Sequence, residues 1–252
     1  MQGREGGSFA VTEKYRIAAF LYHNKALSSF RQALSHVTQE NCHYFFICGG
    51  FLVLTSAASR RTRSLSSHEK SAAPSPLSPI LECIELMRGS HLVQQTADTY
   101  EWIKSGPMSA MVLSVVEGYE SSMDEIASVE IASLISMLQQ KSFGEKRKVC
   151  QTAAEELRQT FRVDAGEKEI GIVFSWPSTC SSEYLALLKA DEPEALLVMA
   201  YWCVLLNKIN WCWIVEGWAQ DILKTIITSI LDETWKPWLR WPIDQVIRPD
   251  AG

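Results

Sequence analysis

The sequence predicts an all-α fold, a single bundle of about eight to eleven helices, and three observations support this prediction. Apolar residues recur at intervals of three and four along most of the chain, which is the period of an amphipathic helix. Alternating strand patterns are absent, and so is the strand–helix alternation that a parallel sheet requires. The 252 residues, 47% hydrophobic and 21% charged, suffice for one large domain or two small ones. We expect one domain, over residues 15–247.

Two helices are expected in the N-terminal part of the chain. Residues 1–14 are expected to form a disordered N-terminus, although the helical pattern already begins near Thr12 and continues to about residue 37. Residues 41–58 predict a second helix, which is apolar on most sides and is therefore expected to be buried. Residues 59–79 are rich in Ser, Pro and charge, and they predict an exposed, mobile loop inside the domain.

Local start and stop signals predict the next helices. Ser78 is placed to cap a helix that has proline at its first position and runs to Gly89. A second element is expected to extend to about residue 104, where Ser105-Gly106-Pro107 interrupts the chain. Ser122, together with the glutamate three residues later, fits a capping box at the start of another helix.

The C-terminal half predicts mainly helices as well. The segment 172–177, "IVFSWP", is short and rich in β-forming residues, but Pro177 limits any strand. Residues 248–252 are expected to form a short tail. Further helices are expected over residues 145–161, 182–189, 193–207 and 213–231.

Charge and cysteine usage exclude several classes of function. The net charge is -5, and the only dense basic run is "SRRTR" at 59–63, so we expect no direct DNA binding by this chain. No apolar run is long enough to span a membrane, and the N-terminus has no signal-peptide core, which predicts an intracellular protein. The seven cysteines are odd in number and lack CxxC spacing, so we expect free buried thiols, no metal and no cofactor.

No motif in the sequence identifies a catalytic residue. The nucleophile elbow, the zinc-protease motif, the P-loop and the dinucleotide-binding motif are all absent from it. Terpene cyclases need clustered aspartates for magnesium, whereas Asp191-Glu192 and Asp232-Glu233 are isolated pairs at expected helix ends. We therefore name no catalytic residue, and the protein is more readily interpreted as something other than an enzyme.

Tryptophan is concentrated near the C-terminus, where eight of the nine lie between residues 176 and 241. One interpretation is a tryptophan-rich hydrophobic core. The other is that a few of them line an apolar cavity suited to a sterol-like ligand. Composition does not separate the two. For the cavity hypothesis the candidate ligand-binding residues are Met199, Trp202, Leu206, Trp213, Gly217, Trp218 and Trp241.

The same C-terminal residues carry a family resemblance. The segments "PEALLVMAYWCVLL" (193–206), "WIVEGWAQDIL" (213–223) and "LDETWKPWLRWPIDQV" (231–246) resemble the end of the regulatory domain of fungal zinc-binuclear-cluster transcription factors of the sterol-uptake-control type. Looser similarity extends from about residue 15 to residue 247. The positions that match the family's pattern are Pro193, Ala195, Leu196, Trp213, Gly217, Trp218, Leu231, Trp235, Trp238, Trp241 and Pro242.

The resemblance implies a helical regulatory domain with a hydrophobic pocket for a sterol-like molecule, located in the nucleus or the cytoplasm. It further implies regulation of a fungal secondary-metabolite gene cluster. The family's six-cysteine zinc module has no counterpart in this chain, whose first cysteine is Cys42. The chain would then reach DNA only through a partner. We expect it to form a homodimer, or a heterodimer with a full-length factor. Two alternatives stay open: a metal-free enzyme, such as a cyclase, that reuses the pocket, and a protein-interaction partner of a full-length factor.

Overall fold

The computed structural model describes residues 5–66, 77–94, 97–107, 109, 125–141, 144–161 and 169–248. Over these ranges the chain forms eleven α-helices and two short 3-10 helices, and no strand. The prediction of an all-α bundle with about eight to eleven helices is therefore confirmed.

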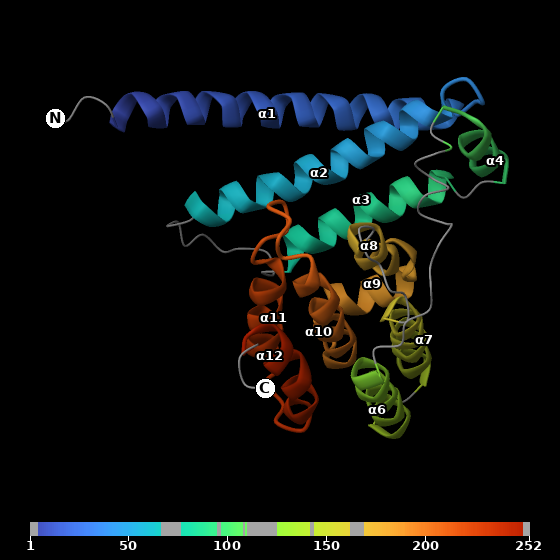
Figure 1. Cartoon of the computed structure of the whole chain (residues 1–252), viewed down its shortest axis with the longest axis vertical. Coiled ribbons are helices and arrows are strands. Elements are labelled where there is room, and N and C mark those ends of the chain that lie inside the picture. The colour runs from blue at the N-terminus through green and yellow to red at the C-terminus, as the bar shows by residue number, and fades with distance from the viewer. Residues whose placement is uncertain are drawn as a thin grey trace.

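Three long helices are stacked at the N-terminal end of the molecule (Figure 1). They are α1 (Glu5–Ala33), α2 (Cys42–Ser66) and α3 (Ser78–Gln94). Helix α1 is outermost and projects past the rest of the molecule in Figure 1, α2 packs between α1 and α3, and α3 contacts α8 (Glu169–Thr179). The short helix α4 (Ala97–Ser105) packs on α2 and α3 and ends at the interruption expected there.

The remaining helices form a body around α10 (Pro193–Lys208). Every residue of α10 from Glu194 to Leu206 is buried, because a helix that is apolar on all sides has no face suited to water. The helices around α10 are α6 (Glu125–Lys141), α7 (Gly144–Phe161), α8, α9 (Ser182–Lys189), α11 (Trp218–Ser229) and α12 (Arg240–Val246).

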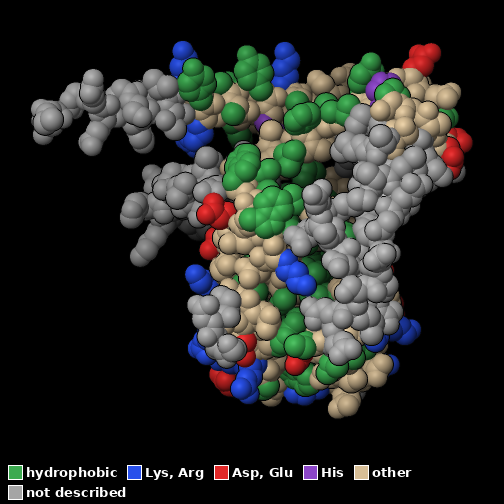
Figure 2. Space-filling model, viewed as in Figure 1, with side chains coloured by type: hydrophobic (Ala, Val, Ile, Leu, Met, Phe, Trp, Pro, Cys, Tyr) green, Lys and Arg blue, Asp and Glu red, His purple; other side chains and the backbone are tan. Residues whose placement is uncertain are grey.

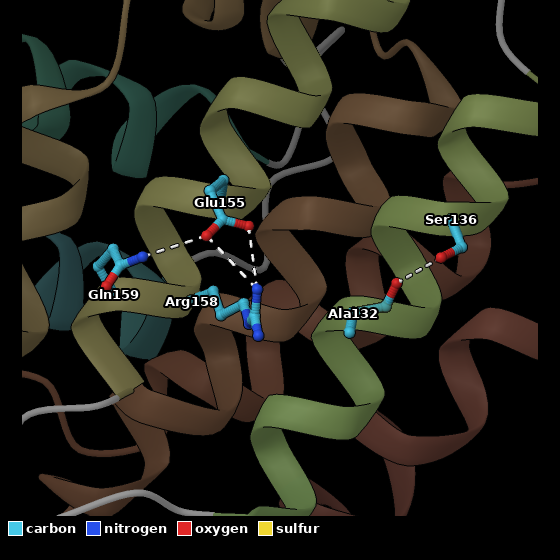
Figure 3. A network of polar contacts seen from close by, with 5 residues as sticks. All are labelled: Ala132, Ser136, Glu155, Arg158 and Gln159. Atoms are coloured by element: carbon cyan, nitrogen blue, oxygen red, sulfur yellow. Dashed lines mark hydrogen bonds and ion pairs between the residues drawn. The ribbon is translucent and has the colours of Figure 1, made fainter.

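Apolar packing joins α6 to α7, while many of their polar contacts stay within one helix. Figure 3 shows Arg158 and Gln159 beside Glu155 on α7, and the Ser136 hydroxyl donating to the Ala132 carbonyl on α6. These partners are three or four residues apart, the spacing at which side chains meet on a helix surface. Both helices contribute buried side chains to the hydrophobic core, among them those of Ile131, Leu134, Leu138, Cys150 and Leu157.

Several boundaries differ from the predictions. Helix α1 begins at Glu5, so residues 5–14 are helical rather than disordered. Helix α2 continues through residues 59–66, the first part of the expected loop, because arginine is a good helix former. Residues 67–76 of that loop and Ser122 of the capping box lie outside the described residues. Helix α3 passes through Gly89 without ending there.

The segment 172–177 is helical, despite its β-forming composition. It forms most of α8, and Ile172, Val173 and Trp176 are buried on the face that meets the body. Burial of these large side chains outweighs their weak preference for strand. Pro177 lies in the last turn of the helix, and its missing N–H removes one helical hydrogen bond, the one to the Val173 carbonyl.

A candidate ligand-binding groove

An apolar groove of about 430 Å³ lies where the N-terminal helices meet the body. Its walls come from α2, α3, α8 and the turn segment 209–217 that precedes α11. Its lining residues are Gly50, Val53, Leu54, Cys83, Met87, Ile170, Gly171, Phe174, Ser178, Cys212, Ile214, Val215 and Trp218.

Each helix turns one face toward the groove. Helix α2 contributes Gly50, Val53 and Leu54, three and four residues apart, and α3 contributes a pair four residues apart. On α8, the lining residues Ile170 and Phe174 also lie four apart. A Cβ atom added to Gly50 would meet nothing within 4 Å, so the glycine leaves open space at the mouth of the groove.

The turn segment closes one side of the groove, and Gly217 sets its geometry. Gly217 has φ +79°, a left-handed conformation that glycine adopts without the steric cost of a side chain. Its backbone N–H donates to the Asn210 Oδ1 atom at 2.8 Å, which ties the end of the turn to its beginning. The chain then enters α11 with Trp218 buried against the groove.

The chemistry of the lining is almost entirely apolar. Among the described residues that line the groove there is no Asp, Glu, His, Lys or Arg. The polar side chains are the Cys83 and Cys212 thiols and the Ser178 hydroxyl, and this hydroxyl donates to the Phe174 carbonyl at 2.7 Å. Such a lining favours a hydrophobic guest with few polar groups.

The seven candidate ligand-binding residues do not come together in this groove. Trp218 lines it, Gly217 shapes the adjoining turn, and Trp202 lies behind it, with its ring 6.2 Å from that of Phe174. Met199 and Leu206 are buried in the core of the body.

Trp213 and Trp241, the other two candidates, lie in different surroundings. Trp213 is 63% exposed. Trp241 packs against Tyr201, with ring centroids 5.1 Å apart, and against Phe161. Most of the C-terminal tryptophans therefore pack in or against the core, as the first interpretation expected. Trp218 also lines the groove, as the second expected.

The sequence analysis missed the groove residues of α2, α3 and α8. The segment 41–58 does carry a signal, because it is apolar on more sides than one helix–helix contact can cover, and it contains the unexplained Gly50. The sequence alone does not show that α2 and α8 line the same groove, since the two helices lie more than 100 residues apart in the chain. Only the tertiary contacts show it.

A second hollow, of about 570 Å³, lies among α1, α2 and α3 and has a mixed lining. It includes Phe20 and Leu27 as well as Arg31, Glu82 and Glu85. At its edge the His23 Nδ1 atom lies 2.7 Å from the Thr55 hydroxyl, and burial lowers the pKa of this histidine. Its charged lining suits an apolar guest less well than the groove at Trp218 does.

Comparison with models of protein families, with curated proteins and with solved structures finds no match for this chain. The resemblance to the sterol-uptake-control type therefore stays a prediction. Within the described ranges, no three His, Cys, Asp or Glu residues are grouped as a metal site would require. None of the helices described is long and apolar enough to cross a bilayer.

Proposed function

We propose that this chain is a regulatory domain of the transcription-factor type that senses a hydrophobic, sterol-like molecule in the groove at Trp218. The observation that carries the proposal is the combination of size and lining. The groove measures about 430 Å³ and its walls are apolar. Small-molecule sites usually measure about 300–1,000 Å³ and have few polar groups.

A rigid, fused-ring ligand suits these walls better than a flexible chain does. Burial of apolar surface supplies the binding free energy, at about 25 cal/mol per Å². A rigid molecule loses little conformational entropy on binding, so more of that free energy remains as affinity. Phe174, which is half-buried, places an aromatic ring in the lining, and the edge of the buried Trp218 adjoins the groove.

The position of the groove supports a sensing role. A bound molecule would touch α2 and α3 on one side, and α8 and the turn before α11 on the other. It would thereby stabilise the arrangement in which the N-terminal helices dock on the body. In this proposal the docked arrangement is the one that a full-length partner factor recognises in the nucleus, where the pair would control secondary-metabolite genes.

Binding is better supported than catalysis in the groove. General acid–base catalysis needs a titratable side chain within reach of the substrate. The described lining offers thiols and one hydroxyl, and that hydroxyl already donates to a backbone carbonyl.

The test combines ligand identification with a variant that fills the groove. The purified chain is extracted for mass spectrometry of bound small molecules, and its thermal unfolding is followed while a sterol such as ergosterol is added. Gly50→Leu places a side chain in the open space of the groove and should abolish the sterol-induced shift. Gly89→Leu makes the same change on α3, where a Cβ also meets nothing within 4 Å but the site is outside the groove, so the shift should persist.

If the wild-type chain carries no lipid and shows no shift at saturating sterol, the proposal is wrong. Equal shifts in Gly50→Leu and the wild-type chain would mean that a sterol binds elsewhere, and they too would overturn the assignment to this groove.

A further inference from the structure

Helix α2 has two apolar faces, and the described part of the chain covers one of them. The inner face holds Cys42, Phe45 and Leu52, which are 1%, 8% and 5% exposed, and Phe45 packs on Phe30 of α1. The opposite face, which we call the outer seam, consists of Tyr44, Ile47, Phe51 and Leu54, which are 65%, 38%, 63% and 44% exposed. A helix that is apolar on both faces is normally buried on both.

The outer seam continues into a larger apolar surface. Leu54 also lines the groove at Trp218, whose far wall is the turn segment that carries Trp211 and Trp213. These two tryptophans are 68% and 63% exposed. Figure 2 shows hydrophobic side chains gathered over α2 and over the segment ahead of α11.

The exposed area of this surface is that of a protein interface. From the side-chain areas of such residues, the outer seam and the two tryptophans expose about 700 Å² together. The largest apolar patch on a typical monomer is about 300–600 Å², whereas a stable interface buries about 800 Å² on each partner.

The spacing and charge of the outer seam favour a second copy of the same helix. Its four residues are separated by three, four and three positions, the repeat with which two helices pair along a shared seam. The chain carries no Asp, Glu, Lys or Arg between residues 41 and 59, so two copies would bring no like charges together.

We propose that the chain forms a two-fold symmetric dimer in which the outer seam of α2 packs antiparallel on the outer seam of a second copy. Trp211 and Trp213 lie at the edge of the contact. Such an interface is self-complementary, because both copies contribute the same surface to the contact. The dimer does not require a bound sterol, and the outer seam shares only Leu54 with the groove lining, so either proposal can fail without the other.

The first test is the molar mass of the purified chain, measured by light scattering and sedimentation over a range of concentrations. The wild-type chain should be a dimer. Ile47→Glu combined with Phe51→Glu would bury charges at the centre of the interface and should weaken association by roughly a hundredfold or more. Leu231→Glu replaces another apolar residue, 84% exposed and outside the seam, and should leave the dimer intact.

The second test uses a native thiol. Cys48 is exposed beside the centre of the outer seam, while the other six cysteines are buried or half-buried. In an antiparallel pair the two Cys48 side chains face one another across the two-fold axis, so a short bismaleimide should join two wild-type chains and should not join two Cys48→Ser chains. This measurement stays decisive if circular dichroism shows that the glutamate variant fails to fold.

Three outcomes would overturn the proposal. One is a monomer at every concentration. Another is a dimer that neither the seam variant alters nor Cys48 joins, since a different face would then form it. The third is a monomer that floats with phosphatidylcholine vesicles through the same side chains, which would assign the outer seam to a lipid surface.

Discussion

The indole N–H of Trp202 donates a hydrogen bond to the backbone carbonyl of Val173 at 2.8 Å. In an α-helix that carbonyl would accept from the residue four positions later, which is Pro177 and has no N–H. The side chain of α10 therefore supplies the donor that the helix α8 lacks. This hydrogen bond joins the buried centre of the body to the helix that forms the floor of the groove.

Replacement of Trp202 by phenylalanine should be unusually destabilising for a change between aromatic residues. It leaves the buried Val173 carbonyl without the indole donor and opens space in the core, at an expected loss of about 2–4 kcal/mol in the free energy of unfolding. The matched control is Trp176→Phe. The Trp176 indole donates to the Ala153 carbonyl at 2.8 Å, in the middle of α7, where the helix offers its own donor. Urea unfolding of both variants should show the larger loss for Trp202→Phe, by about 1–2 kcal/mol.

Stability should fall at alkaline pH because of buried thiols. Burial raises the pKa of Cys150 and of Cys180 from 9.0 to about 12. Burial also raises the pKa of Tyr184, whose hydroxyl donates to the Ala195 carbonyl. The folded state therefore favours the protonated form of each group. The stability this contributes is complete below the unfolded-state pKa, and it is lost as pH rises from about 9 toward about 12.

Thermal unfolding followed from neutral to alkaline pH measures this loss, and a midpoint that stays constant over that range would contradict it. A second measurement is alkylation by iodoacetamide near pH 8, with the modified residues identified by mass spectrometry. Because the thiolate is the reactive form, Cys48 should react in the folded protein, whereas Cys150 and Cys180 should react only after denaturant is added.

Lys146 should stabilise the protein because its ammonium group forms an ion pair with the buried carboxylate of Glu194. Its Nζ atom lies 2.8 Å from Glu192 and 3.3 Å from Glu194, and the Glu194 side chain is 6% exposed. Lys146→Met removes this cation from a buried charge, and we expect a loss of about 1–3 kcal/mol, reduced by the partial exposure of the lysine. Lys148→Met, on the same helix, breaks an exposed contact with Glu145 and should have no measurable effect. Equal losses in the two variants would show that Glu194 does not depend on Lys146.

Replacement by alanine should change the free energy of unfolding in opposite directions at Gly50 and Gly217. Gly50 lies inside α2 with open space around it, so Gly50→Ala should stabilise the protein by about 0.5–1 kcal/mol through reduced freedom of the unfolded chain. Gly217 has φ +79°, and Gly217→Ala should cost about 1–2 kcal/mol because a Cβ is strained there. Denaturant titration measures both. A destabilising Gly50→Ala would mean that the space around this residue is filled in solution.

Local signals in the sequence were sufficient for some helices of the body. They did not suffice for α8, or for α11, which begins at Trp218 although a helix was expected from residue 213. The helix predicted over residues 193–207 is α10 (Pro193–Lys208), because proline marks its first turn and its apolar run has no break. The helix predicted over residues 182–189 coincides with α9, whose Ser181 side chain accepts from the Tyr184 N–H. Capping and periodicity act within a few residues, so they can be recognised in one dimension.

The sequence by itself determined that this chain folds as helices and that its C-terminal part is rich in tryptophan. Only the tertiary structure decided which apolar residues face the core, which face the groove and which face outward. Trp213 and Trp218 illustrate the difference, since five residues apart one is 63% exposed and the other 3%. The left-handed turn at Gly217 lies between them, and α2 completes the groove from more than 100 residues away in the chain. The spacing of apolar residues shows which face of a helix is apolar, whereas the residues that this face contacts depend on how distant helices pack.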